Sequence, residues 1–290
     1  MLKKVLMCTP NHFQVEYQIN PWMKPGTVDT QKALDQWHNL VAAYKASGIE
    51  VEILDQKKGL ADMVFAADQG LIVSKERKIL LLSNFKYTQR QGESLEYKRW
   101  FIDQGYRVDT LPKQLTFEGG GECIPWNGKF FIGEGFRNNS DTYKYIEKKY
   151  KVEFIPLKLI NEKFYHLDTC FFVLNQTTAF YYPPALAEKS ITKLEQLFPN
   201  LIEFTTQEIE AFAANSVVTE NSVFMQTGSQ TFKDKVEFLG YTVIQADISE
   251  FIKSGGGIHC LTFELDRQPQ FQITLKENFT LKITSNPNLN

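Results

Sequence analysis

One pattern recurs five times along the chain: the end of an amphipathic helix, then a turn, then a short strand rich in β-branched residues. The copies lie at residues 44–51, 103–108, 148–152, 198–202 and 238–243. Three of the turns contain a glycine (Gly48, Gly105 or Gly240), which suits the left-handed position that ends a helix. Recurrence at roughly 40–57 residues is typical of repeat architectures. The plainer alternative is the ordinary alternation of helix and strand in an α/β protein.

A second segment follows each copy and favours the repeat. In these segments apolar residues meet polar ones, at 62–68, 117–122, 165–169, 212–216 and 256–260. If five units close around a pseudo-fivefold axis, the segments meet at the centre and bring carboxylates, an imidazole and a thiol into one pocket. Such a polar cluster is costly to bury unless its members pair or bind a ligand. The pattern therefore predicts a ring of five units with a site at its centre.

Composition narrows the choice of ligand. The chain has 290 residues, a formal net charge of −2 and a pI near 6.2, without a basic run. Neither nucleic acid nor an anionic membrane is therefore the expected partner. No apolar stretch approaches the roughly 18 residues of a membrane span, and the four cysteines lack CxxC spacing. We expect a cytoplasmic protein that binds a small molecule, with no metal or organic cofactor; a homo-oligomer is left open.

The residue types at the predicted centre indicate thiolate chemistry. Cys260 follows the glycine run at 255–257, which lets the backbone approach a substrate closely. His166 lies two residues before Asp168, and in a strand these side chains would point to the same face. His259 would then point away from the pocket. A cysteine with a remote histidine and an acidic residue is the ingredient list for nucleophilic catalysis.

Carboxylates at the same centre indicate the charge of the substrate. Asp62, Asp68, Glu118 and Asp168 would place several negative charges near one nucleophile. Planar guanidinium groups match carboxylates through paired, charge-assisted hydrogen bonds. The structural alternative is that these carboxylates cap helices or bind backbone amides. Glu118 would lie at the end of a strand, because no helix-forming pattern opens after it.

The order of these motifs resembles the guanidine-modifying enzymes of the pentein superfamily: arginine deiminases, dimethylarginine dimethylaminohydrolases, amidinotransferases and arginine dihydrolases. The resemblance runs from about Val5 to Phe263. The segments that look most like the arginine dihydrolase branch are residues 17–23, 62–65, 90–93, 164–170 and 181–184. Each string alone is weak, but together, in this order and spacing, they are specific.

The resemblance implies a five-bladed α/β propeller of ββαβ repeats around a central polar pocket. It implies one catalytic domain at 1–270, with a C-terminal extension at 271–290. Cys260 would be the nucleophile, His166 the acid/base and Glu118 its acidic partner. The implied substrate-binding residues are Asp62, Asp68, Asp168 and Phe65 for the guanidinium, Arg90 and Arg137 for the substrate carboxylate, and Asn20 on the entrance segment.

Three positions depart from the relatives. The dihydrolase branch carries Asn where this chain has Asp68, while dimethylargininases have Glu where it has Ala67 and typically Lys where it has Asp168. Because Asp168 would need N–H groups on its ligand, it argues against a methylated guanidine. We expect a hydrolase that converts arginine or a close relative to citrulline and ammonia through an amidino-cysteine, with onward hydrolysis to ornithine open.

Three alternatives remain: amidino transfer, dimethylarginine hydrolysis, and a degenerate pentein that only binds. The first depends on which nucleophile reaches the intermediate. Degenerate penteins that only bind a ligand lack the Cys–His–acid set, whereas this chain has all three residues.

Overall fold

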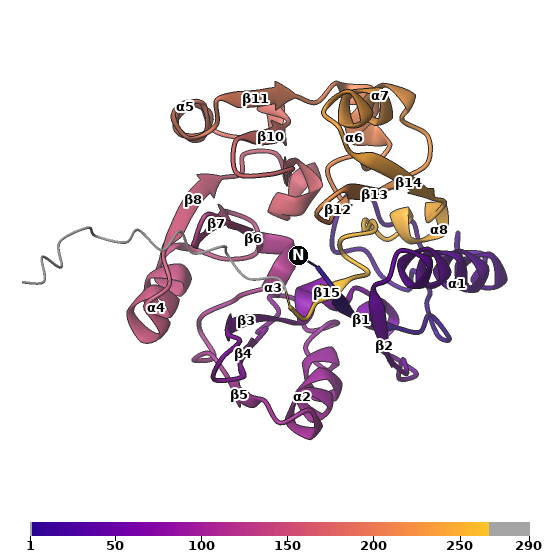
Figure 1. Ribbon diagram of the computed structural model, residues 1–290. Helices are drawn as coiled ribbons and strands as arrows, with labels where there is room; N and C mark the ends of the chain where they lie inside the picture. The colour runs from indigo at the N-terminus through magenta and orange to yellow at the C-terminus, as the bar shows by residue number, and fades with distance from the viewer. Residues whose placement is uncertain (1, 267–290) are drawn as a thin grey trace, which may run out of the picture.

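The computed structural model describes residues 2–266 as five three-stranded sheets set around a common centre, with helices on the outside (Figure 1). In each sheet the central strand pairs antiparallel with one neighbour and parallel with the other. The predicted five-bladed α/β propeller of ββαβ repeats is confirmed. The predicted C-terminal extension at 271–290 lies outside the described residues, and the single domain at 1–270 stays a prediction.

The ends of the described chain meet in the first sheet. It consists of β15 (Phe263–Glu264), β1 (Lys4–Cys8) and β2 (Glu50–Leu54). Val5 pairs with Glu264, so the last described strand completes the sheet that the first strand begins. The second sheet is β3 (Gly70–Ser74), β4 (Ile79–Leu82) and β5 (Arg107–Asp109), and the third is β6 (Cys123–Trp126), β7 (Lys129–Glu134) and β8 (Phe154–Lys158). The fourth is β9 (Phe171–Val173), β10 (Thr178–Tyr181) and β11 (Asn200–Glu203), and the fifth is β12 (Val217–Val218), β13 (Ser222–Gln226) and β14 (Thr242–Ala246).

A helix joins the two parallel strands of every unit, because parallel neighbours need a crossover connection. These helices are α1 (Thr30–Ala46), α2 (Glu93–Asp103), α4 (Ser140–Tyr150), α5 (Glu188–Leu197) and α7 (Gln230–Phe238). Asp29 caps α1 by accepting a hydrogen bond from the Lys32 N–H. The glycines expected after α1, α2 and α7 have left-handed φ angles of +76°, +78° and +89° at Gly48, Gly105 and Gly240.

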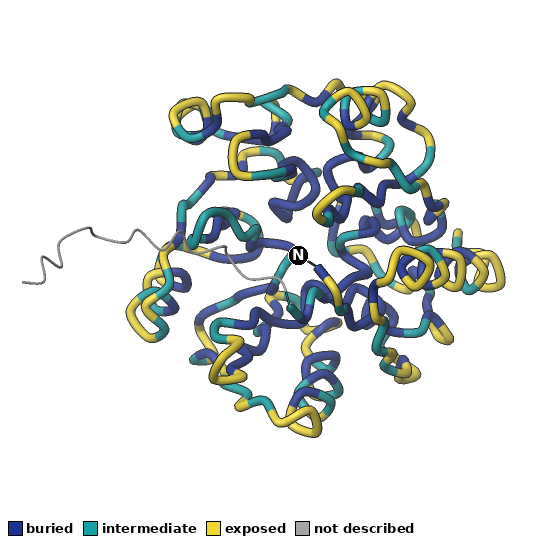
Figure 2. Tube along the Cα trace, in the orientation of Figure 1, coloured by how far each residue is buried: buried dark blue, intermediate teal, exposed yellow. Residues whose placement is uncertain are grey.

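Short helical segments lead from the third strand of each unit back to the centre. They are η1 (Ala61–Val64), η2 (Ala66–Gln69), α3 (Gly119–Glu122), η3 (Glu162–Phe164), η4 (Leu167–Thr169), α6 (Thr206–Glu210) and α8 (Ser249–Ile252), while η5 (Pro183–Ala185) follows β10. Figure 2 shows buried chain around the centre and exposed chain at the rim. Two local predictions were wrong. Asp168 lies in a turn of 3₁₀-helix rather than in a strand, and Glu118 precedes a one-turn helix.

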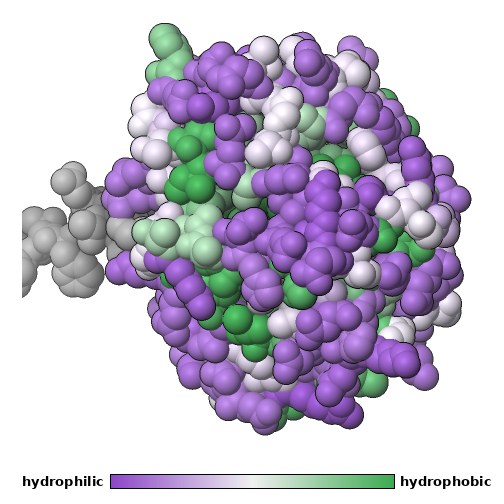
Figure 3. All heavy atoms as spheres, turned by 90° about the vertical axis from the view of Figure 1, so that its right-hand side faces the viewer, coloured by the Kyte–Doolittle hydropathy of each residue, from purple (hydrophilic) through white to green (hydrophobic). Residues whose placement is uncertain are grey.

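The surface carries mostly polar side chains. Figure 3 shows the face around α1, where apolar side chains form small separate groups among hydrophilic ones. Within residues 2–266, none of the helices is long and apolar enough to cross a bilayer. The apolar side chains fill the space between sheets and outer helices; Phe131, for example, packs with Phe171 and Phe198.

Candidate active site

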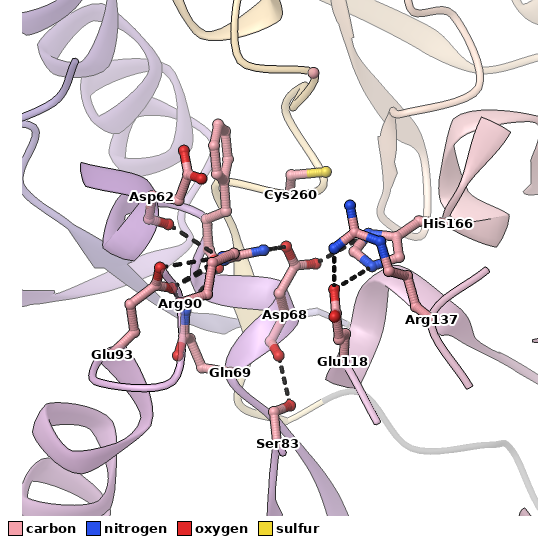
Figure 4. A network of polar contacts seen from close by, with 12 residues as sticks. Asp62, Asp68, Gln69, Ser83, Arg90, Glu93, Glu118, Arg137, His166 and Cys260 are labelled. Carbon is pink, nitrogen blue, oxygen red and sulfur yellow. Dashed lines mark hydrogen bonds and ion pairs between the residues drawn. The ribbon is translucent and has the colours of Figure 1, made fainter. Parts of the chain in front are cut away.

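The inward segments bring together all three predicted catalytic side chains. Cys260, His166 and Glu118 come from three different units, and each is at least 98% buried. Figure 4 shows Cys260 beside Asp68, with the contacts of Arg90 on one side and those of His166 on the other. The remaining predicted binding residues, Asp62, Phe65, Asp168, Arg137 and Asn20, are also buried.

His166, Glu118 and Arg137 form one group, here called the imidazole cluster. His166 Nε2 lies 2.9 Å from Glu118 Oε2, and Arg137 Nη1 donates to the same oxygen at 2.8 Å. The Arg137 guanidinium also stacks between the rings of Tyr87 and Tyr165, 4.7 and 4.4 Å from their centroids. Such stacking and pairing hold a guanidinium rigidly. The cluster is therefore preorganised before any ligand arrives.

Charges in the imidazole cluster favour the ionised forms. Burial opposes ionisation of Glu118, but Arg137 and His166 outweigh it and lower its pKa to about 2. Burial likewise favours neutral His166, yet Asp68 and Glu118 outweigh it and raise its pKa. A protonated imidazole can donate through Nε2 to Glu118 and present a second proton at Nδ1. This is the arrangement that a general acid needs.

Cys260, Asp168, His259 and Asn215 form a second group, the thiol cluster. Cys260 Sγ lies 3.3 Å from Asp168 Oδ2, and His259 Nδ1 lies 2.8 Å from the same oxygen. The prediction that His259 points away from the site was wrong. It assumed strand alternation, whereas residues 258–261 form a turn in which the Leu261 N–H binds Gly257 O at 3.2 Å. Burial, Asp168 and Asp68 raise the pKa of the Cys260 thiol well above its usual value.

Arg90 connects Asp68 to a buried glutamate. Its Nη1 donates to Asp68 Oδ2 at 2.8 Å, and its Nη2 donates to Glu93 Oε2 at 2.9 Å and to the backbone oxygen of Asp62 at 3.3 Å. Nε also donates to Glu93. All three nitrogens of Arg90 thus bind protein acceptors. A role for Arg90 in holding a substrate carboxylate stays a prediction, while the contacts favour a role in anchoring Asp68.

The carboxylates differ in whether the protein itself supplies hydrogen bonds to both of their oxygens. Asp62 accepts hydrogen bonds on both oxygens, from Tyr17 OH and Ser254 Oγ, each at 2.8 Å. By contrast, three other atoms at this centre have no hydrogen-bond partner in the described part of the chain: Asp68 Oδ1, Asp168 Oδ1 and His166 Nδ1. The first and the last of these face each other at 3.7 Å, within ion-pair distance. Buried polar atoms without hydrogen bonds are costly, so a group of them in one place is typical of a binding site.

Glycines allow these groups to approach each other. A Cβ at Gly121 would lie 2.5 Å from Asp68 Oδ1 and 2.6 Å from His166 Nδ1. At Gly256 it would lie 2.1 Å from the ring of Phe65. The glycine run before Cys260, expected to admit close approach of a substrate, therefore also makes room for the protein's own Phe65.

The entrance segment, residues 9–29, covers this centre. Asn20 Nδ2 donates to the backbone oxygen of Ser254 at 3.0 Å, and Arg137 Nη2 donates to the backbone oxygen of Ile19 at 3.1 Å. Asn20 Oδ1 accepts from the Trp22 and Met23 N–H groups. Asn20 therefore fastens the segment over the site, and a direct contact with substrate stays a prediction.

Sequence reasoning overlooked four side chains that contact the site. They are Asn215, His259, Tyr17 and Glu93. Asn215 lies in the fourth inward segment, 212–216, and its position in the repeat is the available signal for it. Tyr17 and Glu93 lie within or beside strings that carried the resemblance, but no spacing rule pairs them with Asp62 or Arg90.

Comparisons with known proteins show the family and the fold of the chain. Residues 9–267 match the family model described as N,N dimethylarginine dimethylhydrolase, eukaryotic. The chain is 37% identical over 269 residues to the bifunctional arginine dihydrolase/ornithine cyclodeaminase ArgZ of Synechocystis sp. (strain ATCC 27184 / PCC 6803 / Kazusa). That match covers 90% of this chain but 37% of ArgZ, so the chain spans little more than a third of this relative.

Two further comparisons cover most of this chain and most of the protein compared with it. The N(G),N(G)-dimethylarginine dimethylaminohydrolase of Mycobacterium tuberculosis (strain ATCC 25618 / H37Rv) is 32% identical over 91% of this chain and 86% of that protein. The crystal structure of the substrate-bound N-terminal domain of ArgZ superposes with a TM-score of 0.87 at 35% identity, covering 92% of this chain and 99% of that one. The chain belongs to the N,N dimethylarginine dimethylhydrolase family of the pentein superfamily.

Proposed function

We propose that this protein is a hydrolase that breaks a C–N bond of the arginine guanidinium, with Cys260 as nucleophile, and releases ammonia and citrulline. The observation that carries the proposal is the group of buried atoms without hydrogen-bond partners, Asp68 Oδ1, Asp168 Oδ1 and His166 Nδ1, together with the contact of Asp168 with the Cys260 thiol. A guanidinium offers N–H donors to both carboxylate oxygens and places its carbon near the sulfur. ArgZ, a relative described as an arginine dihydrolase, has this fold and a substrate-bound structure.

Binding would prepare the nucleophile. In the free protein the raised pKa keeps Cys260 as a neutral thiol, because Asp168 and Asp68 oppose a third negative charge. A bound guanidinium cancels part of that field, so the thiol proton passes to solvent water and the thiolate forms next to the carbon it attacks. The released proton balances the later release of ammonia, which takes it up as ammonium. The thiolate is the reactive form of cysteine.

The bond changes then follow in two halves. The thiolate attacks the guanidinium carbon, His166 gives its proton to the departing nitrogen, the C–N bond breaks and ammonia leaves. The amidino group remains on Cys260. Neutral His166 next takes a proton from water as the water oxygen attacks the same carbon. The C–S bond breaks, the second water proton returns to the sulfur, and citrulline is released. Another structure of the N-terminal domain of ArgZ is described as covalently bound to a reaction intermediate.

A methylated arginine is the second candidate substrate, because the matching family model and the Mycobacterium tuberculosis relative carry that description. The contacts of this chain favour unmodified arginine. Both Asp68 and Asp168 present a buried oxygen without a hydrogen-bond partner, and an N–H donor on the substrate would satisfy each. Two methyl groups on one terminal nitrogen remove donors and leave a buried carboxylate oxygen unpaired, which costs binding free energy.

The test is incubation with arginine, asymmetric dimethylarginine and agmatine, with products identified by mass spectrometry. We expect citrulline and ammonia from arginine, a lower kcat/KM for dimethylarginine, and no turnover by Cys260→Ser, whose hydroxyl ionises far less readily than a thiol. A covalent amidino adduct trapped in a His166 variant should map to Cys260. An adduct on buried Cys123 or Cys170, or turnover of the methylated substrate alone, would overturn the proposal.

A further inference from the structure

One of the five inward segments has no part in the proposed reaction. The first contributes Asp62 and Asp68, the second Glu118, the third His166 and Asp168, and the fifth Cys260. The fourth, residues 212–216, also reaches the centre, and its residues are buried. A ring in which four equivalent segments carry the chemistry raises the question of what the remaining one does.

Asn215 is the residue of this segment that contacts the nucleophile. Its side chain is fully buried and contacts Cys260 at two places. Asn215 Oδ1 accepts from the Cys260 N–H at 3.0 Å, and Asn215 Nδ2 donates to Cys260 Sγ at 3.2 Å. Nδ2 also lies 3.3 Å from the backbone oxygen of Asp168. The Asn215 amide therefore binds both the backbone and the sulfur of Cys260, and it also contacts the backbone of Asp168.

The backbone around Asn215 is unusual. Phe212 has φ +57°, and it is the buried member of the four non-glycine residues with positive φ in the described chain. A bulky residue adopts this conformation at a cost, and such strain persists where the surrounding structure imposes it. The turn is closed by the Asn215 N–H, which donates to Phe212 O at 3.1 Å, and by Ser216 Oγ, which donates to Ala213 O at 2.7 Å.

The segment that leads to Cys260 has room for Asn215 because it contains a glycine at 257. A Cβ at Gly257 would lie 2.6 Å from Asn215 Oδ1 and 2.8 Å from its Cβ. The His259 N–H donates to Asn215 O at 3.1 Å, which ties the turn to the residue before Cys260. The third glycine of the run thus makes room for this amide, just as Gly256 makes room for Phe65.

We propose that Asn215 is a positioning residue that stabilises the thiolate of Cys260 and directs its sulfur toward the proposed guanidinium site. The inference rests on the proposed role of Cys260. When the thiol loses its proton, its contact with Asp168 Oδ2 changes from a hydrogen bond to a repulsion between two negative charges. The Nδ2–H of Asn215 then becomes more favourable, because hydrogen bonds to charged groups are stronger than neutral ones. The N–H of Gly257 acts in the same direction.

Two substitutions and a control test the inference. Asn215→Asp keeps the shape and the acceptor for the Cys260 N–H but removes the donor to sulfur. Asn215→Ala removes both and serves if the aspartate variant does not fold. Ser216→Ala is the matched control, because Ser216 is buried in the same turn and binds its backbone without touching Cys260.

The first measurement is the rate at which iodoacetamide modifies Cys260 at pH values from 6 to 9. Peptide mass mapping monitors the modification. This rate follows the thiolate fraction and needs no substrate. We expect the Asn215 variants to react roughly 10–100-fold more slowly at each pH, as loss of a hydrogen bond to a charged group predicts. Ser216→Ala should react like the native protein. Equal rates in all four proteins would overturn the inference, and so would equal slowing in Ser216→Ala.

The second measurement separates positioning from binding. We expect kcat for arginine to fall by about the same factor in the Asn215 variants. The Kd for arginine, measured by calorimetry with Cys260→Ser in both backgrounds, should stay within about twofold. Asn215 contacts Cys260 and the Asp168 backbone, and not the carboxylate oxygens proposed to hold the guanidinium. A loss confined to Kd or to Tm would mean a merely structural role. If the native protein does not turn over arginine, the proposed function fails, while the alkylation rates still decide the role of Asn215.

Discussion

The imidazole cluster and the thiol cluster share one buried centre but lie in opposite electrostatic surroundings. In the first, Glu118 is paired with Arg137 and His166, so its pKa falls to about 2 and the pKa of His166 rises. In the second, Cys260 faces Asp168 and Asp68, and the pKa of its thiol rises. The surroundings therefore favour a charged imidazole and a neutral thiol in the free protein. The comparison teaches that His166 is held in its acidic form without a ligand, whereas Cys260 needs a cationic ligand to become a thiolate.

The largest effect should come from removing the charge that holds His166 protonated. Glu118→Gln keeps the shape but not the anion, so the pKa of His166 should fall. Because the protonated imidazole is required, native activity declines as the pH rises through that raised pKa. In the variant the decline should begin at lower pH, and kcat should drop roughly 10²–10⁴-fold, the usual contribution of acid–base catalysis. The pH profile of kcat is the measurement. An unmoved decline would show that Glu118 does not set the charge of His166.

Arg90→Ala should affect both clusters, because it removes the cation that pairs with Asp68. It leaves Asp68 and Glu93 buried without their shared cation, which typically costs about 3–5 kcal/mol of unfolding free energy. Uncompensated Asp68 would also raise the pKa of Cys260 further. Because the contacts favour an anchoring role, kcat/KM should fall by similar factors for arginine and for agmatine, which lacks the carboxylate. Urea unfolding and kinetics with both substrates test this. A loss confined to arginine would restore the carboxylate-binding role.

Arg90 illustrates what sequence reasoning could and could not reach. The five repeats follow from helix ends and strands that local pattern describes well, and the inward segments follow from the repeats. The positions of Cys260, His166 and Glu118 were therefore accessible. What Arg90 binds depends on Glu93 and Asp68, whose distances are set by the packing of α2 against η2. His259 was misplaced because strand alternation was assumed in a turn, and Asn215 lacks a charge that would have singled it out.

Gly121→Ala tests the junction of the two clusters. The added methyl would lie 2.5 Å from Asp68 Oδ1 and 2.6 Å from His166 Nδ1, so both groups must move apart or the helix α3 must shift. Overpacking of this kind typically costs about 1–3 kcal/mol, and kcat/KM should fall with it. Gly120→Ala is the matched control, because its methyl would meet Ala67 alone among its nearest neighbours, at 3.0 Å or more. Similar activity losses in both variants would mean that crowding in α3, not the junction, matters.

Asp68→Asn should produce the smallest effect, a change in product ratio, and it tests the charge that Asp68 places near Cys260 after the first turnover. Asp68 pairs well with the guanidinium of arginine but poorly with the neutral ureido group of citrulline, because a buried carboxylate then loses its counter-charge. Citrulline should therefore leave before a second attack. Asparagine offers both a donor and an acceptor, so it can hold the ureido oxygen and permit a second hydrolysis to ornithine. One neutral hydrogen bond corresponds to a shift of roughly 2–10-fold in the ornithine-to-citrulline ratio. Time-resolved mass spectrometry of both products measures it. Ornithine as the main product of the native protein, without accumulating citrulline, would mean that Asp68 retains citrulline, for example by taking up a proton, a change that its raised pKa favours.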